Sequence, residues 1–426
     1  MIPAGMAPVI LALVVVTSIL LMLIRPRNVP EVYWISAGVA LLLALRLISF
    51  RLTERALVKA VDVCLFLVGM MLLSELAREH GVFDWLSAIA IRNSRGSCTR
   101  LFVLVYAIGT IVTVLLSNDA TAVVLTPAIL TAVRKAKVKP LPYLFVCAFI
   151  ANAASFVLPI SNPANLVVFR GAMPPLANWM LAFGLPSLLS IVTTFVVLRW
   201  LFREQLQSRL AFEVEERNLN GNGRIVVASM GLIVAILLIA SWRARDLGLP
   251  TCLAALAITA IVCIKEKRSP YPLVRAIGWE TLALVSGLFV MVDAMETIGA
   301  MEHTKRWLAD ATHMGLAAGQ FVVGFTVGFA NNLVNNLPLG LIAGSTVQAS
   351  HANSAIANAL LIGVDLGPNL SITGSLATIL WLIALRREKL DVSFWDFSRI
   401  GVIAMPAALL SALTGSILMQ FWVHSS

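Results

Sequence analysis

Long apolar runs recur along this chain from its start to its end. The runs at residues 6–24 and 177–200 each approach the roughly 20 residues that an α-helix needs to cross a hydrocarbon layer of about 30 Å. Hydrophobic residues make up 59% of the 426 residues and charged residues only 13%, which is too little charge to cover a soluble domain of this size. The sequence therefore predicts an all-α integral membrane protein that has the lipid bilayer as its main solvent.

By this length criterion we expect about ten transmembrane helices, five in each half of the chain. They lie near residues 6–24, 34–50, 57–77, 141–169, 177–200, 224–242, 251–266, 278–298, 354–385 and 392–421. Two further apolar regions, 101–135 and 319–347, are interrupted near their middle by polar residues. Because lipid cannot hydrogen-bond a polar tip, we expect both regions to be re-entrant hairpins whose tips are buried in protein.

The two halves of the chain resemble each other at an offset of 218 residues. Acidic and amide positions fall in register at this offset: Asp62 with Glu280, Glu75 with Asp293, and Ser117-Asn118 with Asn335-Asn336. An odd number of crossings in each half gives the halves opposite orientations, as in secondary transporters built from inverted repeats. We therefore divide the chain into a first membrane repeat (1–202), a cytoplasmic linker (203–223) and a second membrane repeat (224–426).

Most of the 32 Lys and Arg residues lie in loops on one side of the predicted helices, in segments such as 78–100, 134–139 and 265–275. The positive-inside rule places this side in the cytoplasm and both termini in the periplasm, if the membrane is a bacterial inner membrane. The net charge of +10 is thus explained by orientation. No basic run interleaved with aromatic residues lies on a soluble segment, so nucleic acid is not an expected partner.

Four segments interrupt the apolar pattern at mid-membrane depth. Residues 117–121 and 331–338 lie at the hairpin tips, and residues 159–165 and 365–375 lie within broken helices. The prolines remove backbone donors and unwind a helix, which frees helix ends to face a substrate. Asn, Ser and Thr offer donors and acceptors without a fixed charge, which suits a small polyhydroxy solute or a partly dehydrated cation. For any single residue, the alternative of a capping role stays open.

We expect the four interruptions to form one substrate-binding chamber. The candidate binding residues are Ser117, Asn118, Asn162, Asn165, Asn335, Asn336, Asn369, Ser371 and Thr373. Asp119 and Asp365 also lie in the interruptions. Because an acid at mid-membrane depth costs about 2.5–3.5 kcal/mol on insertion scales, we expect these two to be the carriers of protons.

Other acids lie on the third and eighth predicted spans: Asp62, Glu75, Glu280, Asp293 and Glu296. Their alternative role is pairing with a base such as Lys59, Arg78 or Arg46. We prefer pairing or an interfacial position for Glu75 and Glu296, and we leave Asp62 and Glu280 open between the two roles.

Several chemical classes have no support in the sequence. The five cysteines show no C-x-x-C spacing and the five histidines show no metal-ligand spacing. No Walker A motif and no nucleophile–base pair is visible. We therefore expect neither an enzyme nor a bound metal or cofactor.

The residues around the second broken helix resemble a known family. Residues 363–382 read GVDLGPNLSITGSLATILWL, similar to the D-L-G-P and G-S-L-A-T-x-L-W signature of bacterial arsenical-pump membrane proteins. Residues 117–127 and 335–338 are similar to the A-N-D-G…L-T-P hairpin and the N-N-x-P element of that family. Ser117, Ala120 and Asn369 depart from the family pattern of Ala, Gly and a basic residue.

The resemblance implies the fold of the ion-transporter superfamily, with re-entrant hairpins and broken helices. The activity that it implies is proton-coupled export of trivalent arsenic or antimony hydroxide, in some members with a separate cytosolic ATPase subunit. Two alternatives stay open: a sodium/proton antiporter of the same superfamily, and the membrane anchor or channel subunit of an ATP-driven arsenite pump. A dicarboxylate carrier is disfavoured because the four interruptions contain no Arg or Lys.

Overall fold

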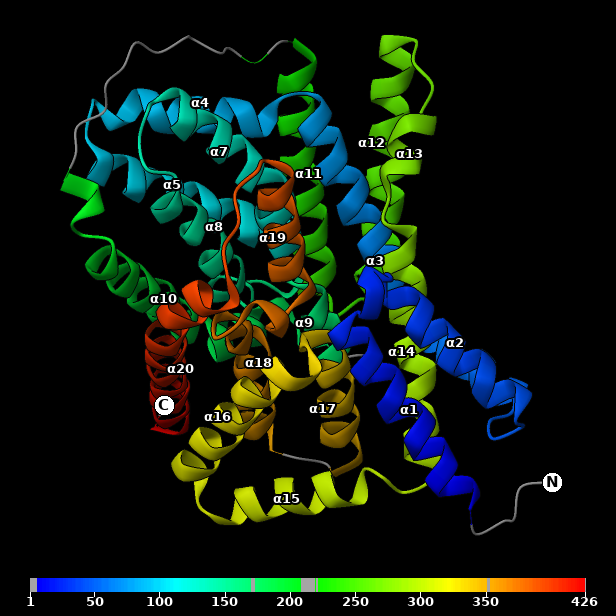
Figure 1. Ribbon diagram of the computed structural model, residues 1–426. Coiled ribbons are helices and arrows are strands. Elements are labelled where there is room, and N and C mark those ends of the chain that lie inside the picture. Colours follow the sequence, from blue (N-terminus) through cyan, green and yellow to red (C-terminus); the bar gives the residue numbers. More distant parts are fainter. Residues whose placement is uncertain (1–5, 170–172, 208–218, 220, 351–352, 426) are drawn as a thin grey trace.

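The computed structural model describes residues 6–169, 173–207, 219, 221–350 and 353–425, and every regular element in them is helical (Figure 1). The first half contains α1 (Ala7–Ile24), α2 (Glu31–Ala44), α3 (Phe50–Glu79), α4 (Val82–Ser94), α5 (Cys98–Leu115), α6 (Asn118–Ala120), a π-helical turn (Thr121–Leu125), α7 (Thr126–Lys135), α8 (Leu141–Ala153), α9 (Pro163–Val168) and α10 (Leu176–Leu201). The second half contains α11 (Gly221–Trp242), α12 (Gly248–Glu266), α13 (Tyr271–Ala276), α14 (Trp279–Thr297), α15 (Glu302–His313), α16 (Leu316–Val334), α17 (Asn336–Ser350), α18 (Ser354–Leu366), α19 (Leu376–Arg387) and α20 (Phe394–Ser425).

The two halves pass through the same order of elements. Each half begins with two helices. The next span is the single long helix α3 in the first half and the pair α13–α14 in the second. A short crosswise helix, a hairpin, a broken helix and a final long helix follow in both halves. The crosswise helix α4 lies at the top of Figure 1, whereas its counterpart α15 lies at the bottom. The halves are therefore inverted, as the 218-residue offset predicts.

The number of membrane-crossing helices depends on how the broken ones are counted. Eight described helices are long and apolar enough to cross a membrane, or nine if α14 and α15, which meet at 84°, form one span. The sequence predicts about ten. Within the described residues, this length criterion leaves out α2, which has 14 residues and matches the predicted span 34–50, and the broken spans α8–α9 and α18–α19, since each piece is short. It includes the hairpin arms α5 and α16. The predicted all-helical, multi-pass architecture is confirmed.

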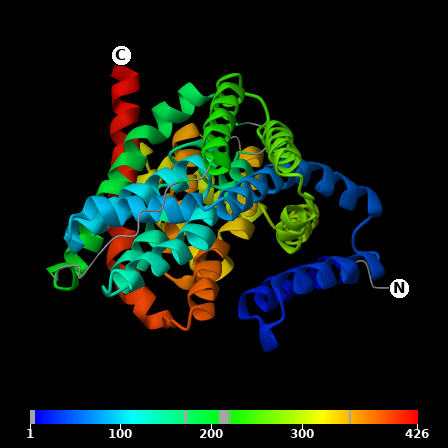
Figure 2. The same cartoon turned by 90° about the horizontal axis from the view of Figure 1, so that it is seen from above.

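The ends of the described chain lie at one end of the molecule. α1 begins and α20 ends toward the end that holds α15, opposite α4 and α13 (Figure 1). Seen from above, α1 and α20 lie on opposite sides with the broken helices between them (Figure 2). α10 ends at Leu201 and α11 begins at Gly221. Most of the predicted linker 203–223 lies outside the described residues, so the division into repeats and linker stays a prediction.

Two helices in the middle of the fold are buried on all sides. Every residue of α8 after Leu141 is buried, and so is most of α18. Such helices are apolar around their whole circumference rather than along one stripe. Both lead directly into the broken segments, so the polar interruptions lie at the ends of the most deeply buried helices.

Glycines bring α16 and α18 into backbone contact. A Cβ atom added at Gly363 would lie 2.6 Å from the carbonyl oxygen of Gly324, and one added at Gly367 would lie 2.5 Å from that of Gly328. Gly324 and Gly328 form the small-xxx-small pattern of the second hairpin, which favours close helix packing in membranes. This contact fixes the first arm of the second hairpin against the second broken helix.

We expect Gly367→Ala to destabilise the protein by about 1–3 kcal/mol, because overpacking of a tight contact costs that much. A matched control is Gly231→Ala on α11, where an added Cβ meets nothing within 4 Å. The thermal midpoint of the purified protein in detergent measures the difference. Equal midpoints for the two variants would contradict the close contact.

Candidate functional site

Side-chain hydrogen bonds join the two broken helices. The Asn162 amide Nδ2 donates to the Asp365 carboxylate Oδ1 at 2.8 Å, and both side chains are buried. A second bond of the same kind lies beside it, where Asn152 Nδ2 donates to Asn369 Oδ1 at 2.9 Å. Residues some 200 positions apart in the chain are thus held together at the centre of the fold.

Each hairpin is attached to a broken helix. At the first hairpin, the Ser161 hydroxyl donates to the Val114 carbonyl at 3.0 Å. At the second, the Ser371 hydroxyl donates to Asn332 Oδ1 at 2.7 Å, and Asn335 Nδ2 donates to the Thr373 carbonyl at 3.2 Å. These bonds join each hairpin to a broken helix; that the four interruptions form one substrate-binding chamber stays a prediction.

A polar side chain caps the helix that follows each interruption. The capping bonds run from Ala120 N to Ser117 Oγ at 3.3 Å, from Ala164 N to Asn162 Oδ1 at 3.0 Å, from Leu337 N to Asn335 Oδ1 at 3.4 Å, and from Thr378 N to Ser375 Oγ at 3.1 Å. A helix leaves its first N–H groups unsatisfied, and Ser and Asn are preferred residues for accepting from them. In lipid no water can replace these acceptors. Capping is thus a real role of these residues.

The side-chain amides of several predicted binding residues hydrogen-bond to the unwound backbone of the broken helices. The Asn165 Nδ2 lies within bonding distance of three carbonyls, those of Ser155, Leu158 and Pro159, at 2.9–3.3 Å. The Asn369 Nδ2 donates to the Phe149 carbonyl at 3.1 Å. These contacts stabilise unwound backbone in a buried setting, where an unpaired polar group costs about 1–3 kcal/mol.

The second hairpin tip has strained geometry. Asn335 has φ 78° and ψ 153°, a region of backbone space that side-chain-bearing residues rarely enter and that costs about 1–3 kcal/mol. Its neighbour Asn336 is buried, and its Oδ1 has no hydrogen-bond partner within the described residues. Strain and an unpaired amide oxygen occur together at this tip, which is the pattern expected where a ligand is held.

A cavity of about 560 Å³ reaches the first hairpin tip. Ser117 and Asp119 lie on one wall, together with Pro163 of the first broken helix. α3 and the turn between α13 and α14 form the opposite wall; their polar members are Ser74, Glu75, Arg275, Trp279, Glu280 and Thr281. Asp365 is fully buried and is not among the residues that line this cavity. The two predicted proton carriers therefore have different surroundings.

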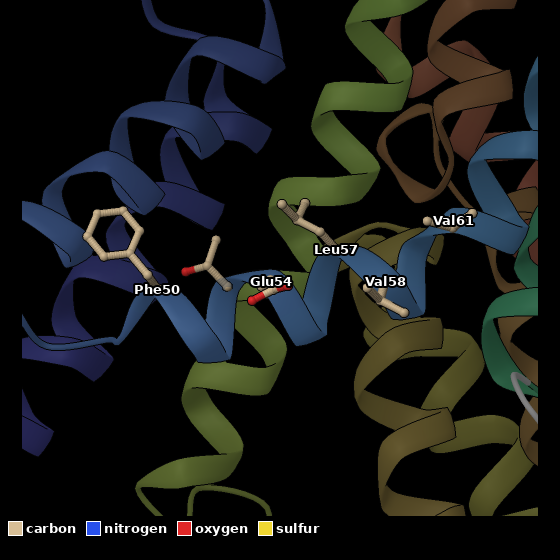
Figure 3. A pocket seen from close by; sticks show the side chains of 6 residues that line it. Phe50, Glu54, Leu57, Val58 and Val61 are labelled. Atoms are coloured by element: carbon tan, nitrogen blue, oxygen red, sulfur yellow. The ribbon is translucent and has the colours of Figure 1, made fainter.

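A second hollow, of about 450 Å³, has a different character. Its lining residues all lie on the first half of α3, from Phe50 to Val61 (Figure 3). The lining is mostly apolar and includes none of the four interruptions. We assign it no part in the site.

The other intramembrane acids are mostly engaged. Lys59 Nζ donates to Asp293 Oδ2 at 2.6 Å, and Asp62 Oδ1 accepts from the Gly248 backbone N–H at 2.8 Å. Glu75 forms a two-bond ion pair with Arg78 at 2.8 and 2.5 Å. The preferred pairing role of Glu75 is confirmed.

Sequence reasoning missed some residues of this region. Asn152 was not among the predicted residues, because it precedes the break and looks like part of an apolar helix. Asn331 and Asn332 lie within the predicted tip segment but outside the candidate set, and they donate to the Val364 and Gly367 carbonyls. Glu280 was left open, although its register with Asp62 marked it as unusual. The signal for all four was a polar residue inside an apolar span.

Comparison with known proteins adds a family and a fold. A family model described as citrate transporter (CitMHS) matches residues 19–364. The arsenical pump membrane protein of Yersinia enterocolitica is 26% identical over 351 residues, covering 79% of this chain and 81% of that protein. The putative arsenical pump membrane protein of Bacillus subtilis is 22% identical over 427 residues, covering 94% and 96%.

Among solved structures, the YdaH transporter of Alcanivorax borkumensis matches with a TM-score of 0.57 and 15% identity. The match covers 87% of each chain. At this identity the likeness concerns the fold alone.

We expect Asn162→Asp to destabilise the fold by about 1–3 kcal/mol near neutral pH, since it puts a carboxylate against Asp365 in place of a donor. The new side chain keeps the oxygen that caps α9. At acidic pH a shared proton turns the repulsion into a hydrogen bond, so stability returns as pH falls. The thermal midpoint between pH 5 and pH 8 measures this.

The control is Asn162→Ser, which also keeps a capping oxygen but adds no charge. Its deficit should vary less with pH than that of Asn162→Asp, because it removes the donor to Asp365 without adding a second carboxyl group. A pH-independent deficit in Asn162→Asp would contradict the direct contact with Asp365.

Proposed function

The chain belongs to the citrate transporter family, CitMHS, and is a multi-pass membrane transporter; within that family we propose that it exports trivalent arsenic or antimony hydroxide in exchange for protons. The membrane is the bacterial inner membrane, with the α4 and α13 end in the cytoplasm. The relatives named as arsenical pump membrane proteins, which align over most of this chain, support the choice of substrate.

The observation that carries the proposal is the cavity that ends at the first hairpin tip. It brings a hydroxyl, Ser117, and a carboxylate, Asp119, to the same surface. Arsenous acid is a neutral molecule with three hydroxyl groups, and neutral hydroxyls pair well with hydroxyl and amide groups. Asn118 and Asn336 are buried and do not line the cavity in this state; in the proposal their amides meet the substrate when the chamber rearranges.

The remaining amides support this chamber. Asn162, Asn165, Asn369, Ser371 and Thr373 hydrogen-bond within the protein, so their first role is to hold the unwound segments in place. Asp365 accepts a hydrogen bond from Asn162, so we assign it the same structural role. Asp119 lines the cavity and Asp365 does not, so we assign the coupled proton to Asp119.

The cycle follows from this assignment. Asp119 takes a proton while the chamber faces the periplasm, and releases it when the chamber faces the cytoplasm, where substrate then binds. Asp119 returns outward with substrate by a rocking or elevator motion. One charge moving through roughly 150 mV provides about 3.5 kcal/mol, enough for a few-hundred-fold gradient.

Arsenite uptake into proteoliposomes with the cytoplasmic end outward tests the proposal. The lumen is made acidic, and no ATPase is present. We expect pH-gradient-driven uptake in the wild type and a loss of at least about tenfold in Asp119→Asn, since proton exchange at a positioned group is worth at least that much. Asp365→Asn can still accept from Asn162 and should retain most of the activity.

Sodium and citrate are the comparison solutes in the same vesicles. Proton flux that depends on sodium and not on arsenite would favour a sodium/proton antiporter. Flux that depends on citrate would favour a carboxylate carrier, with Arg275 in the cavity as the cation that meets it. Uptake of arsenite only after addition of an ATPase subunit would support the anchor role instead. Unchanged transport in Asp119→Asn would remove the carrier assignment.

A further inference from the structure

The cavity at the first hairpin tip is lined by acidic residues other than Asp119, and the transport proposal gives them no role. Three carboxylates line it: Asp119 on the hairpin, Glu75 on α3 and Glu280 on α14. Arg275, on α13, is the cation among the lining residues. A proton released by Asp119 toward the α13 end must pass through this space, so the state of the other two acids affects its departure.

Glu75 is poorly suited to accept that proton. Arg78 holds it through two hydrogen bonds, Nε to Oε2 at 2.8 Å and a terminal guanidinium nitrogen to Oε1 at 2.5 Å. Such two-bond pairs between guanidinium and carboxylate are among the stronger charged contacts in proteins. A proton bound to Glu75 would disrupt this pair, which makes Glu75 a poor relay.

The surroundings of Glu280 differ from those of Glu75. It is solvent-exposed in the first turn of α14, and within the described part of the chain no hydrogen bond or ion pair engages its carboxylate. A carboxylate that lines the cavity, is exposed and is not held by a guanidinium can accept a proton from cavity water and release it to solvent.

We propose that Glu280 is the proton-relay residue between Asp119 and the water at the α13 end. This inference rests on the proposed proton coupling and extends it to a second residue. The proton leaves the Asp119 carboxyl, passes through water in the cavity and binds the Glu280 carboxylate, which then releases it to solvent. Asp119 becomes ionised, Glu280 returns to its starting state, and no charge is gained or lost in the relay.

The test compares Glu280→Gln with Glu280→Asp and with Glu75→Gln as the matched control on the same wall. Two rates are measured in the vesicles described above. One is net uptake driven by the pH gradient, and the other is arsenite counterflow at equal pH, which needs no net proton release. The concentration of a membrane-impermeant outer buffer is varied, since a buffer base can replace a missing relay.

We expect Glu280→Gln to lower net uptake at least about tenfold, while counterflow stays within about twofold of wild type. Raising the outer buffer should restore net uptake, and Glu280→Asp should restore it without buffer. Glu75→Gln should not respond to buffer. Equal loss of both rates in Glu280→Gln would indicate a structural or binding role and would overturn the relay, as would unchanged net uptake.

Failure of the transport proposal is distinguishable from failure of the relay. If the wild type moves sodium or citrate against protons instead of arsenite, the same variants are compared with that solute. If outer buffer restores net uptake of that solute by Glu280→Gln, the relay proposal is supported. If it does not, the relay proposal is wrong. A wild type that couples none of the three solutes to protons would overturn both proposals.

Discussion

The hydrogen bond from Asn162 to Asp365 holds together the two segments on which the rest of the architecture depends. Each is an unwound stretch at the end of a buried helix, α8 or α18, in a region where no water can satisfy a free backbone group. Asn162 also caps α9, so one side chain serves both broken helices. The hairpins then attach to this pair, the first through Ser161 and the second through Asn332 and Ser371.

This arrangement separates the polar residues into two groups. Asn165 and Asn369 are occupied by backbone carbonyls and give the chamber its shape. Ser117 and Asp119 lie on the wall of a cavity, which neither Asn165 nor Asn369 lines. Amides can serve in both groups because they carry donors and acceptors without the large cost of burying a charge.

The sequence predicted the helical architecture and the inverted halves, because these follow from long apolar runs and from the repeated order of spans. It could not separate capping residues from cavity residues, since both are Asn and Ser in the same segments. Asp119 and Asp365 looked equivalent for the same reason. Their difference depends on which side chain faces α3 and α14, and that is set by packing between helices far apart in the chain. The distinction between Glu75 and Glu280 likewise depends on Arg78, one turn away on α3.

The backbone contact between α16 and α18 limits how this molecule can change shape. With the carbonyl oxygens of Gly324 and Gly328 set against Gly363 and Gly367, neither helix can slide or rotate past the other without a clash. The hairpin, the broken helix and the residues bonded to them must travel as a single rigid unit.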